Sequence, residues 1–309
     1  MRILFIDTVH PLLKQELEKR SYICDTAYEK SKTEIQQTIY NYQGIVIRSR
    51  FKIDKEFIDA ATNLEFIARA GSGLDNIDLN YSEKRSINCY NAAEGNRQAV
   101  AEHALGMLLS LFNNLNEVGK EIRNGIWERE KNRGIELAGK TIGIIGYGNT
   151  GSAFTEILKG FGVNILTYDK YLNNYPNKST MERIYKESDI LSLHVPLTEE
   201  TTYLVNEDFI RKFKKEIYLI NTSRGKCVNT EHLVSALENG TIKGACLDVL
   251  EYEKSSFEQL KSSGFTDDMQ YIIESKETIL SPHVAGWTIE SNIKIAEVLL
   301  QKIITDSYQ

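Results

Sequence analysis

The sequence predicts an α/β protein built from two doubly wound parallel sheets, and three observations lead to this prediction. Short apolar runs rich in Ile, Val and Leu alternate with amphipathic segments, a pattern typical of buried parallel strands joined by helical crossovers. The chain of 309 residues is longer than a single core usually allows. A glycine-rich turn also follows one of the apolar runs near the middle of the chain.

The first third of the chain has the pattern of half a doubly wound sheet. Strands are expected at 3–6, 44–47 and 64–68, where apolar residues run together. Amphipathic stretches at 11–20 and 32–40 are expected to form the helices between them. The first apolar run is too short for a signal peptide, so it is interpreted as a buried strand.

A long helix is predicted next, from 97 to 116, with so little polar face that it must be buried on more than one side. A closing helix is predicted at 288–305. Between these helices, six further strands match a dinucleotide-binding sheet. They are expected at 142–145, 164–168, 189–193, 218–221, 245–249 and 279–280.

The composition argues against several classes of partner. A formal net charge of −6 gives no general attraction for nucleic acid or an anionic membrane. The apolar stretch at 104–112 is far shorter than the roughly 20 residues needed to span a bilayer. The cysteines are distant from one another and show no metal-site spacing, so we expect reduced structural thiols and no metal. A cytoplasmic protein without nucleic-acid or membrane partners is expected.

The strongest local motif is a predicted strand that runs into GxGxxG and then into a helix. Gly146 permits the tight turn, Gly148 lets the backbone approach a pyrophosphate, and Gly151 permits close packing of the helix. The amides and dipole of this helix, which begins around Asn149 and Thr150, favour phosphate groups. The motif therefore predicts a dinucleotide site.

The next predicted strand ends at Asp169, which helps to distinguish the two nicotinamide dinucleotides. A carboxylate there can accept both ribose hydroxyls of adenosine and would repel a 2′-phosphate. NAD is therefore expected as the cofactor in preference to NADP, although the neighbouring Lys170 would soften that preference.

Three ionisable residues follow strands of the second series: Arg224, Glu253 and His283. Since ligands bind at the carboxyl ends of such strands, all three can converge on the nicotinamide. Hydride transfer to a 2-oxo acid needs a cation for the carboxylate and an acid for the developing alkoxide, roles that suit arginine and histidine. A glutamate would orient the histidine and stabilise its protonated form. Taken singly, each residue also has an interpretation without a catalytic role. Arg224 would be a surface arginine, Glu253 a solvated glutamate and His283 a histidine that caps a strand.

Several blocks, in the same order and over essentially the whole chain, resemble the D-isomer-specific 2-hydroxyacid dehydrogenase family. Besides the glycine motif they are RAGSGLDNID (69–78), NAAEGN (91–96), VAEH (100–103), GIW (125–127), HVPLT (194–198), NTSRG (221–225), LDV (247–249) and SPHVAG (281–286). The resemblance implies a Rossmann NAD-binding domain of residues 97–285, inserted in a flavodoxin-like substrate domain of residues 1–96 and 286–309.

The resemblance also implies roles for individual residues. Arg224 would bind substrate, His283 would be the acid/base and Glu253 would pair with it. Asp248 would contact the nicotinamide amide. The remaining cofactor contacts would come from Thr222, His194 and Pro196. In the alternative interpretation, His194 is a core histidine whose ring is hydrogen-bonded within the fold. His103, on the long helix, is interpreted as structural.

The sequence leaves the identity of the paired acid open, because Glu251 lies two positions before Glu253. The family usually has an acid-rich stretch ending in proline at this point, and this chain does not. Glu253 is preferred on its spacing from Arg224. The segment 254–276 is also longer than expected, and it would be either an inserted surface loop or a subunit contact.

Arginines suggest the substrate. Arg48, Arg69 and Arg129 resemble the phosphate-binding arginines of the D-3-phosphoglycerate dehydrogenase-like members. In the alternative interpretation, Arg48 orients the loop as in members that act on unphosphorylated acids, and Arg129 is solvated. Ser72 and Gly73 belong to the loop whose amides receive the substrate carboxylate. The expected reaction is NAD-dependent interconversion of a D-2-hydroxyacid and its 2-oxo acid, with 3-phosphoglycerate and 3-phosphohydroxypyruvate as the leading pair.

Two other functions and one assembly stay open at this point. A glyoxylate, hydroxypyruvate or D-lactate reductase would use the same scaffold, and an NAD-sensing co-repressor-like binding protein would use it without turnover. A homodimer is expected, with the apolar helix at 101–115 either at its interface or buried within its own chain.

Overall fold

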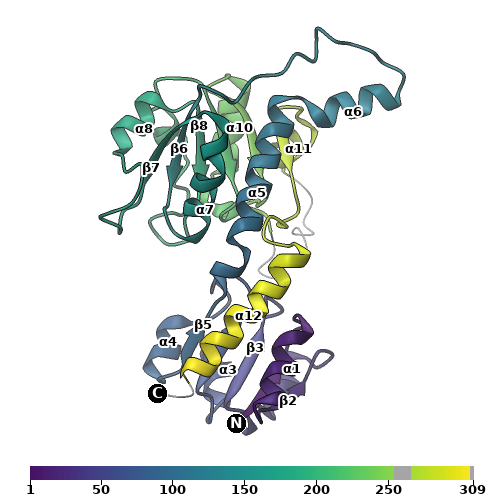
Figure 1. Ribbon diagram of the computed structural model, residues 1–309, viewed down its shortest axis with the longest axis vertical. Helices are drawn as coiled ribbons and strands as arrows, with labels where there is room; N and C mark the ends of the chain where they lie inside the picture. The colour runs from purple at the N-terminus through teal and green to yellow at the C-terminus, as the bar shows by residue number, and fades with distance from the viewer. Residues whose placement is uncertain (254–265, 307–309) are drawn as a thin grey trace. The chain divides into compact units, whose positions relative to one another are not determined.

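The computed structural model of the chain describes residues 1–253 and 266–306. These residues divide into two compact units. Unit 1 holds Met1–Arg97 and 287–306, and unit 2 holds Gln98–Glu253 and 266–286. Each unit contains one parallel sheet with helices on both faces (Figure 1). The chain enters unit 2 within one helix, α5 (Ala93–Phe112), and returns to unit 1 at Trp287.

The sheet of unit 1 has the strand order β2-β1-β3-β4-β5, the flavodoxin-like order. Its strands are β1 (Arg2–Phe5), β2 (Ile23–Thr26), β3 (Gly44–Ile47), β4 (Phe66–Arg69) and β5 (Asn88–Tyr90). The central strand β3 is buried along its whole length, and Ile45 and Ile47 face one layer of helices while Val46 faces the other. This alternation is the reason that one short strand anchors two cores.

Helices cover both faces of this sheet. Helices α1 (Pro11–Lys19) and α12 (Ile289–Asp306) share one core, and the other helices cover the opposite face. Those are α2 (Lys32–Gln36), the short 3₁₀ helix η1 (Ile39–Asn41), α3 (Lys55–Ala60) and α4 (Leu79–Lys84). The helix predicted at 32–40 is thus shorter, since it ends at Gln36 and the chain continues in a 3₁₀ turn.

The sheet of unit 2 has the order β11-β10-β9-β8-β6-β7. Its strands are β6 (Thr141–Ile145), β7 (Asn164–Tyr168), β8 (Ile190–Leu193), β9 (Ile217–Asn221), β10 (Ile242–Leu247) and β11 (Thr278–Leu280). From β6 the chain goes first to β7 on one side and then to β8 on the other. The strand order therefore reverses between β6 and β8, which is the place where a doubly wound sheet binds its ligand.

Helices also cover both faces of this second sheet. Helices α5 and α7 (Asn149–Leu158) pack on one face. The opposite face is covered by α8 (Met181–Glu187), α9 (Glu207–Ile210), α10 (Thr230–Glu238) and α11 (Asp267–Glu274). Two 3₁₀ turns, η2 (Lys159–Phe161) and η3 (Gly225–Cys227), follow α7 and β9. Of the long segment noted at 254–276, residues 254–265 lie outside the described residues.

The single helix predicted at 97–116 is wrong at its C-terminal end. Helix α5 stops at Phe112, Asn114 takes a left-handed conformation with φ 52°, and α6 (Leu115–Arg123) starts afresh. The apolar residues Ala104 and Leu108 of α5 are buried in the core of unit 2. Burial within its own chain is therefore what the structure shows for this helix.

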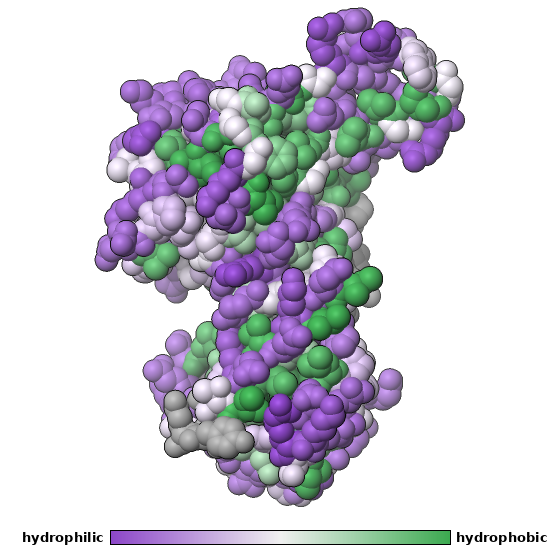
Figure 2. Space-filling model, viewed as in Figure 1, coloured by the Kyte–Doolittle hydropathy of each residue, from purple (hydrophilic) through white to green (hydrophobic). Residues whose placement is uncertain are grey.

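Helix α6 and the loop after it stand off from the rest of unit 2 (Figure 1). We call residues 115–136 the arm. None of the described residues of α6 is buried, and apolar residues interrupt the polar surface of the arm (Figure 2). Its exposed large apolar residues are Leu115, Ile122, Ile126, Trp127 and Ile135. No helix in the described part of the chain is long and apolar enough to span a membrane.

Candidate active site

The glycine motif forms a tight turn between β6 and α7, packed against β8. Gly146 has φ 93°, and a Cβ atom there would lie 2.2 Å from the carbonyl oxygen of His194. A Cβ atom on Gly151 would lie 2.0 Å from the carbonyl oxygen of Gly146. Only glycine allows these close approaches.

The middle glycine of the motif differs from the other two. A Cβ atom on Gly148 would meet no described atom within 4 Å, and Gly148 is the N-cap of α7 without a side-chain cap. The first amides of α7 therefore face open space and carry the positive end of the helix dipole. This cradle fits a pyrophosphate group.

Asp169 follows β7 and is held by the backbone around it. Its Oδ2 accepts a hydrogen bond from the Tyr147 amide at 2.8 Å, and its Oδ1 accepts from the amides of Tyr171 at 2.9 Å and Leu172 at 3.0 Å. Burial alone would raise the pKa of this carboxyl, but the three amide donors outweigh it and the pKa is lowered. Because a carboxylate can accept about four hydrogen bonds, it keeps capacity for a ribose hydroxyl.

Lys170, next to this carboxylate, has a partner of its own. Its Nζ lies 2.6 Å from both carboxylate oxygens of Glu200. The pair is exposed, but its charges offset each other locally. The negative charge of Asp169 therefore dominates at the end of β7, as discrimination against a 2′-phosphate requires.

His194 is a buried link between β8 and α7. Its Nε2 lies 2.8 Å from the Ser192 hydroxyl, its Nδ1 lies 3.2 Å from the Thr150 hydroxyl, and its ring packs on Phe154. Burial lowers the pKa of His194 to about 3, so the ring is neutral at physiological pH. The His194 side chain is thus a hydrogen-bonded core group, which was the alternative interpretation of the sequence. The backbone carbonyl oxygen of His194 lies close against Gly146. The carbonyl oxygen of Pro196 accepts a hydrogen bond from the Thr201 hydroxyl at 2.6 Å.

Asp248 has a role in unit 2 that the sequence did not reveal. It is 2% exposed, and its Oδ1 accepts hydrogen bonds from the Ser281 hydroxyl at 2.6 Å and the Val284 amide at 2.8 Å. Its Oδ2 accepts from the Ala285 amide at 3.0 Å. This one buried carboxylate therefore fixes the turn after β11.

His103 extends this network from helix α5, and Thr222 lies elsewhere at the end of β9. The Ser281 hydroxyl donates its hydrogen bond to Asp248. The His103 Nε2, 2.8 Å from the same hydroxyl, is therefore the donor in the second hydrogen bond, and the Ser281 oxygen accepts it. Neither contact is visible in the sequence, because 178 positions separate His103 from Ser281. The buried hydroxyl oxygen of Thr222 has no hydrogen-bond partner among the described residues.

The turn after β11 presents His283 to Glu253. His283 has φ 55°, a left-handed backbone that is uncommon outside glycine, and its amide donates to the Asp248 carbonyl oxygen at 2.7 Å. Its Nδ1 lies 2.7 Å from the Glu253 Oε2, and the two side chains are 24% and 14% exposed. The second oxygen of Glu253 accepts a hydrogen bond from the Leu250 amide.

Glu251 points to different partners. Its Oε1 accepts a hydrogen bond from the Tyr203 hydroxyl at 2.6 Å. Its Oε2 accepts from the amide of Thr230 at 3.1 Å and from its hydroxyl at 2.7 Å. Of the two rival acids, the structure therefore brings Glu253 to the histidine, while Glu251 caps helix α10.

Arg224 lies in the turn after β9. The Arg224 Nη1 donates to the Ser223 carbonyl oxygen at 2.7 Å, and the Asn221 side-chain amide donates to the Arg224 carbonyl oxygen at 3.0 Å. A Cβ atom on Gly225 would lie 2.0 Å from the Leu250 carbonyl oxygen. This close approach packs the turn of Arg224 against the loop that carries Glu253, so all three predicted catalytic residues belong to loops at the carboxyl ends of neighbouring strands.

In unit 1 the structure brings Arg48 and Arg69 together. The Arg48 amide donates to Asp7 at 2.6 Å, and its carbonyl oxygen accepts from the Arg69 Nε at 3.1 Å. Gly71 has φ 155°, a backbone conformation that favours glycine, and the end of the Arg69 side chain lies close against it. The Arg69 guanidinium is thereby held against the backbone of Arg48, at the ends of β3 and β4.

The predicted loop after Gly71 is tied to the start of α5. The Ser72 hydroxyl donates to the Asn96 side chain at 2.5 Å, and the Asn91 side chain donates to the Ser72 carbonyl oxygen at 2.7 Å. Gly73 follows in the same partly exposed loop. Arg129 belongs to unit 2, where it is exposed on the arm, whereas Arg48 and Arg69 belong to unit 1.

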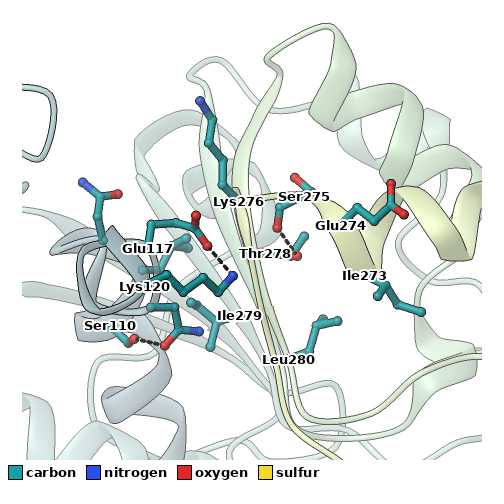
Figure 3. A pocket seen from close by; sticks show the side chains of 13 residues that line it. Ser110, Glu117, Lys120, Ile273, Glu274, Ser275, Lys276, Thr278, Ile279 and Leu280 are labelled. Atoms are coloured by element: carbon teal, nitrogen blue, oxygen red, sulfur yellow. Dashed lines mark hydrogen bonds and ion pairs between the residues drawn. The ribbon is translucent and has the colours of Figure 1, made fainter. Parts of the chain in front are cut away.

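A cavity of about 170 Å³ in unit 2 is separate from these residues (Figure 3). It lies between the α5–α6 junction and the α11–β11 turn, and Lys120 and Glu117 form an ion pair at 2.7 Å on its wall. None of the predicted site residues lines it. In the described residues no group of three or more His, Cys, Asp or Glu side chains could hold a metal ion. The four cysteines, all of them in that part of the chain, are free, and burial raises the pKa of Cys24 to about 11.

Comparison with known proteins shows the family to which this chain belongs. Residues 105–285 match the model described as the D-isomer-specific 2-hydroxyacid dehydrogenase NAD-binding domain. A hydroxypyruvate reductase from Thermotoga maritima is 33% identical and covers 95% of this chain and 92% of its own. A glyoxylate reductase from Thermofilum pendens is 36% identical over 91% of this chain and 85% of its own. A D-3-phosphoglycerate dehydrogenase from Archaeoglobus fulgidus is 30% identical over 98% of this chain, which spans 57% of that relative's length.

A solved structure supports the same placement. The structure of a D-2-hydroxyisocaproate dehydrogenase aligns with a TM-score of 0.83 at 25% identity, covering 99% of this chain and 96% of the other. The fold predicted from the sequence, with its two parallel α/β sheets, is thereby confirmed.

Proposed function

The chain belongs to the family of D-isomer-specific 2-hydroxyacid dehydrogenases, which are NAD-dependent oxidoreductases, and on this premise we propose that it interconverts a D-2-hydroxyacid and its 2-oxo acid. We further propose 3-phosphoglycerate and 3-phosphohydroxypyruvate as the pair. The observation that carries the activity is the contact of His283 with Glu253, 2.7 Å between Nδ1 and Oε2, in a turn fixed by Asp248.

The cofactor site of this proposal is the loop region at the carboxyl ends of β6 and β7. The open space at Gly148 and the uncapped start of α7 fit the pyrophosphate, and the ionised Asp169 fits an unphosphorylated ribose. When bound, NAD supplies the hydride acceptor, and NADH the donor. The neutral His194 stabilises this loop, because its ring is hydrogen-bonded to Ser192 of β8 and to Thr150 of α7.

The chain's own residues supply the rest of the reaction. Because Nδ1 of His283 is held by Glu253, its Nε2 is the nitrogen that exchanges a proton with the substrate oxygen. In reduction, Nε2 gives its proton to the carbonyl oxygen as a hydride reaches C2, which yields the hydroxyl group. The planar guanidinium of Arg224 matches the substrate carboxylate with two parallel hydrogen bonds.

The phosphorylated substrate is supported by unit 1. Arg48 follows β3 and Arg69 ends the neighbouring strand β4, so two cationic side chains start from adjacent backbone positions, an arrangement suited to a second anionic group. We propose unit 1, with Ser72 and Gly73 in its loop, as the substrate domain. Arg129 would add to this site only if the arm reaches it.

Reduction of hydroxypyruvate or glyoxylate is the second candidate. It is favoured because two relatives, of which the chain covers 92% and 85%, carry those names. Neither substrate has a phosphate, so the two candidates differ in their need for Arg48. A purely NAD-sensing binding protein would have no use for the pairing of Glu253 with His283.

Steady-state kinetics with NADH and four oxo acids test the proposal: 3-phosphohydroxypyruvate, hydroxypyruvate, glyoxylate and pyruvate. The expected result is the highest kcat/KM for 3-phosphohydroxypyruvate. Arg48→Gln should lower that value by about tenfold or more and leave hydroxypyruvate nearly unchanged. Equal kcat/KM for the first two acids would overturn the phosphate assignment, and no turnover of any acid would overturn the activity.

We also propose a homodimer formed through the arm. None of the described residues of α6 is buried, and Trp127 is 77% exposed. Exposed apolar groups gathered on one protruding element mark an interaction surface. A second copy of this chain fits the expectation of a closed symmetric assembly.

A further inference from the structure

Trp287 is an exposed aromatic residue in unit 1 that the catalytic scheme does not use. It is one of two tryptophans in the chain and is 63% exposed. It stands directly before α12, where the chain returns to unit 1. A large aromatic side chain that stays open to solvent is a common mark of a binding surface.

The indole ring has a specific partner. The guanidinium carbon of Arg48 lies 4.0 Å from the centre of the Trp287 ring, the distance of a close cation–π contact. Such stacking uses the flat face of the guanidinium, whereas hydrogen bonds to an anion use its edges. The stack therefore orients Arg48 without competing with a phosphate for the same N–H groups.

The backbone of Arg48 is also fixed on both sides. Asp7 accepts its amide hydrogen, and Arg69 and Asn76 donate to its carbonyl oxygen at 3.1 and 3.2 Å. With the main chain held in this way, the orientation of the side chain depends on its own contacts, and the Trp287 ring supplies one of them. Arginine has high rotamer entropy, so a flat aromatic support before binding raises affinity by reducing the ordering needed on binding.

We propose that Trp287 is a specificity-determining residue that positions Arg48 to receive the second anionic group, a phosphate, of a phosphorylated 2-oxo acid. The inference rests on the proposed function. A substrate with a carboxylate alone does not engage Arg48, so its turnover is independent of Trp287. Trp287 thereby acts on the choice between phosphorylated and unphosphorylated acids.

The kinetic test compares variants on two substrates. Trp287→Ala should raise the KM for 3-phosphohydroxypyruvate about tenfold, with the KM for hydroxypyruvate and for NADH within twofold of wild type. Trp287→Phe, which keeps an aromatic face, should recover most of the loss. Ile289→Ala is the matched control, because Ile289 is 81% exposed on the same segment. An equal effect of Trp287→Ala on both oxo acids, or none on either, overturns the inference.

A second test needs no turnover. In Trp127→Phe the only tryptophan left is Trp287, so its fluorescence reports on the stack. Titration with inorganic phosphate should change that emission in a saturable way, and the added Arg48→Gln substitution should abolish the response. An emission that phosphate does not change, or a response that survives Arg48→Gln, overturns the inference. If the response is present but no oxo acid is reduced, the anion contact stands and the proposed function fails.

Discussion

At the scale of single residues, the contact of Glu253 with His283 gives the first prediction. Glu253→Gln keeps a hydrogen-bond partner for Nδ1 but removes the negative charge, so the protonated imidazole loses its support. The kcat of oxo acid reduction should fall about 10- to 100-fold. Steady-state kinetics at saturating NADH and oxo acid measure this fall.

Glu251→Gln is the matched control, since the same chemical change is made two positions away. Glu251 caps helix α10 through Thr230, so the variant should lose at most about 1 kcal/mol of stability and keep its kinetics. If Glu251→Gln lowered kcat and Glu253→Gln did not, the assignment of the two acids would be reversed.

His194 gives the second prediction, on stability. Its pKa is lowered by burial from 6.5 to about 3, so the unfolded chain binds a proton in this window that the folded chain does not. The stabilising effect is full above about pH 6.5 and is lost as the pH falls towards 3. From about pH 6.5 to 5, the free energy of unfolding should fall by about 1.5 kcal/mol more in wild type than in His194→Gln.

Urea unfolding at the two pH values measures this difference. The partly exposed His232, which accepts the Glu207 amide, supplies the control variant His232→Gln. Identical pH dependence in wild type and His194→Gln would show that His194 does not stay neutral in the folded chain. Carboxylates that titrate in the same range affect all three proteins equally and cancel in the comparison.

The residue-level site could be predicted from the sequence only where chain position decides geometry. Arg224 and His283 directly follow strands, so the parallel sheet itself places them at its carboxyl edge. Glu251 and Glu253 lie in an irregular loop. There, neither a helical or strand periodicity nor a strand register indicates which carboxylate points towards His283. The network of Asp248, Ser281 and His103 depends on tertiary contacts over distances in sequence that local patterns do not encode.

At the scale of elements, the glycine turn between β6 and α7 gives the third prediction. Gly148→Ala adds a methyl group to open space, so the thermal midpoint of the protein alone should change little. The same methyl group would occupy the space proposed for the pyrophosphate, so the KM for NAD should rise about tenfold or more.

Gly151→Ala is the informative counterpart in the same turn. Its Cβ atom would lie 2.0 Å from the Gly146 carbonyl oxygen, so the turn must open, at a cost of about 1–3 kcal/mol in stability. Thermal unfolding with and without NAD separates the two variants. A Gly148→Ala protein that binds NAD normally would contradict the assignment of the cradle.

The prediction of elements from the sequence succeeded where strands are buried on both faces. All six strands of unit 2 were predicted, and so was β3, which is buried throughout. The strands β2 and β5 were missed, because they are the edges of their sheet and are largely unburied: β2 has one buried residue and β5 has none. The break between α5 and α6 was missed because Asn114 ends an apolar period without a glycine or proline.

At the scale of the whole molecule, the chain forms two α/β units, and it passes from one to the other within helix α5 and again at Trp287. Each has its own buried cores, and the candidate residues are divided between them: the arginine pair lies in unit 1, and the cofactor loop with the acid/base pair lies in unit 2. The candidate residues for a second anionic group of the substrate therefore belong to one unit, and those proposed for the cofactor, the substrate carboxylate and proton transfer belong to the other.

The arm gives the last prediction. Ile122 and Ile126 are 47% and 44% exposed on it, and burial of their remaining exposed surface between two copies would favour a dimer by about 1 kcal/mol each. Sedimentation velocity should therefore find the wild-type chain as a dimer and Ile122→Asp/Ile126→Asp as a monomer, because two buried charges would face an apolar partner. Ile289→Asp, which changes an exposed isoleucine outside the arm, should remain dimeric. A monomeric wild-type chain, or a double variant that still dimerises, would exclude the arm as the interface.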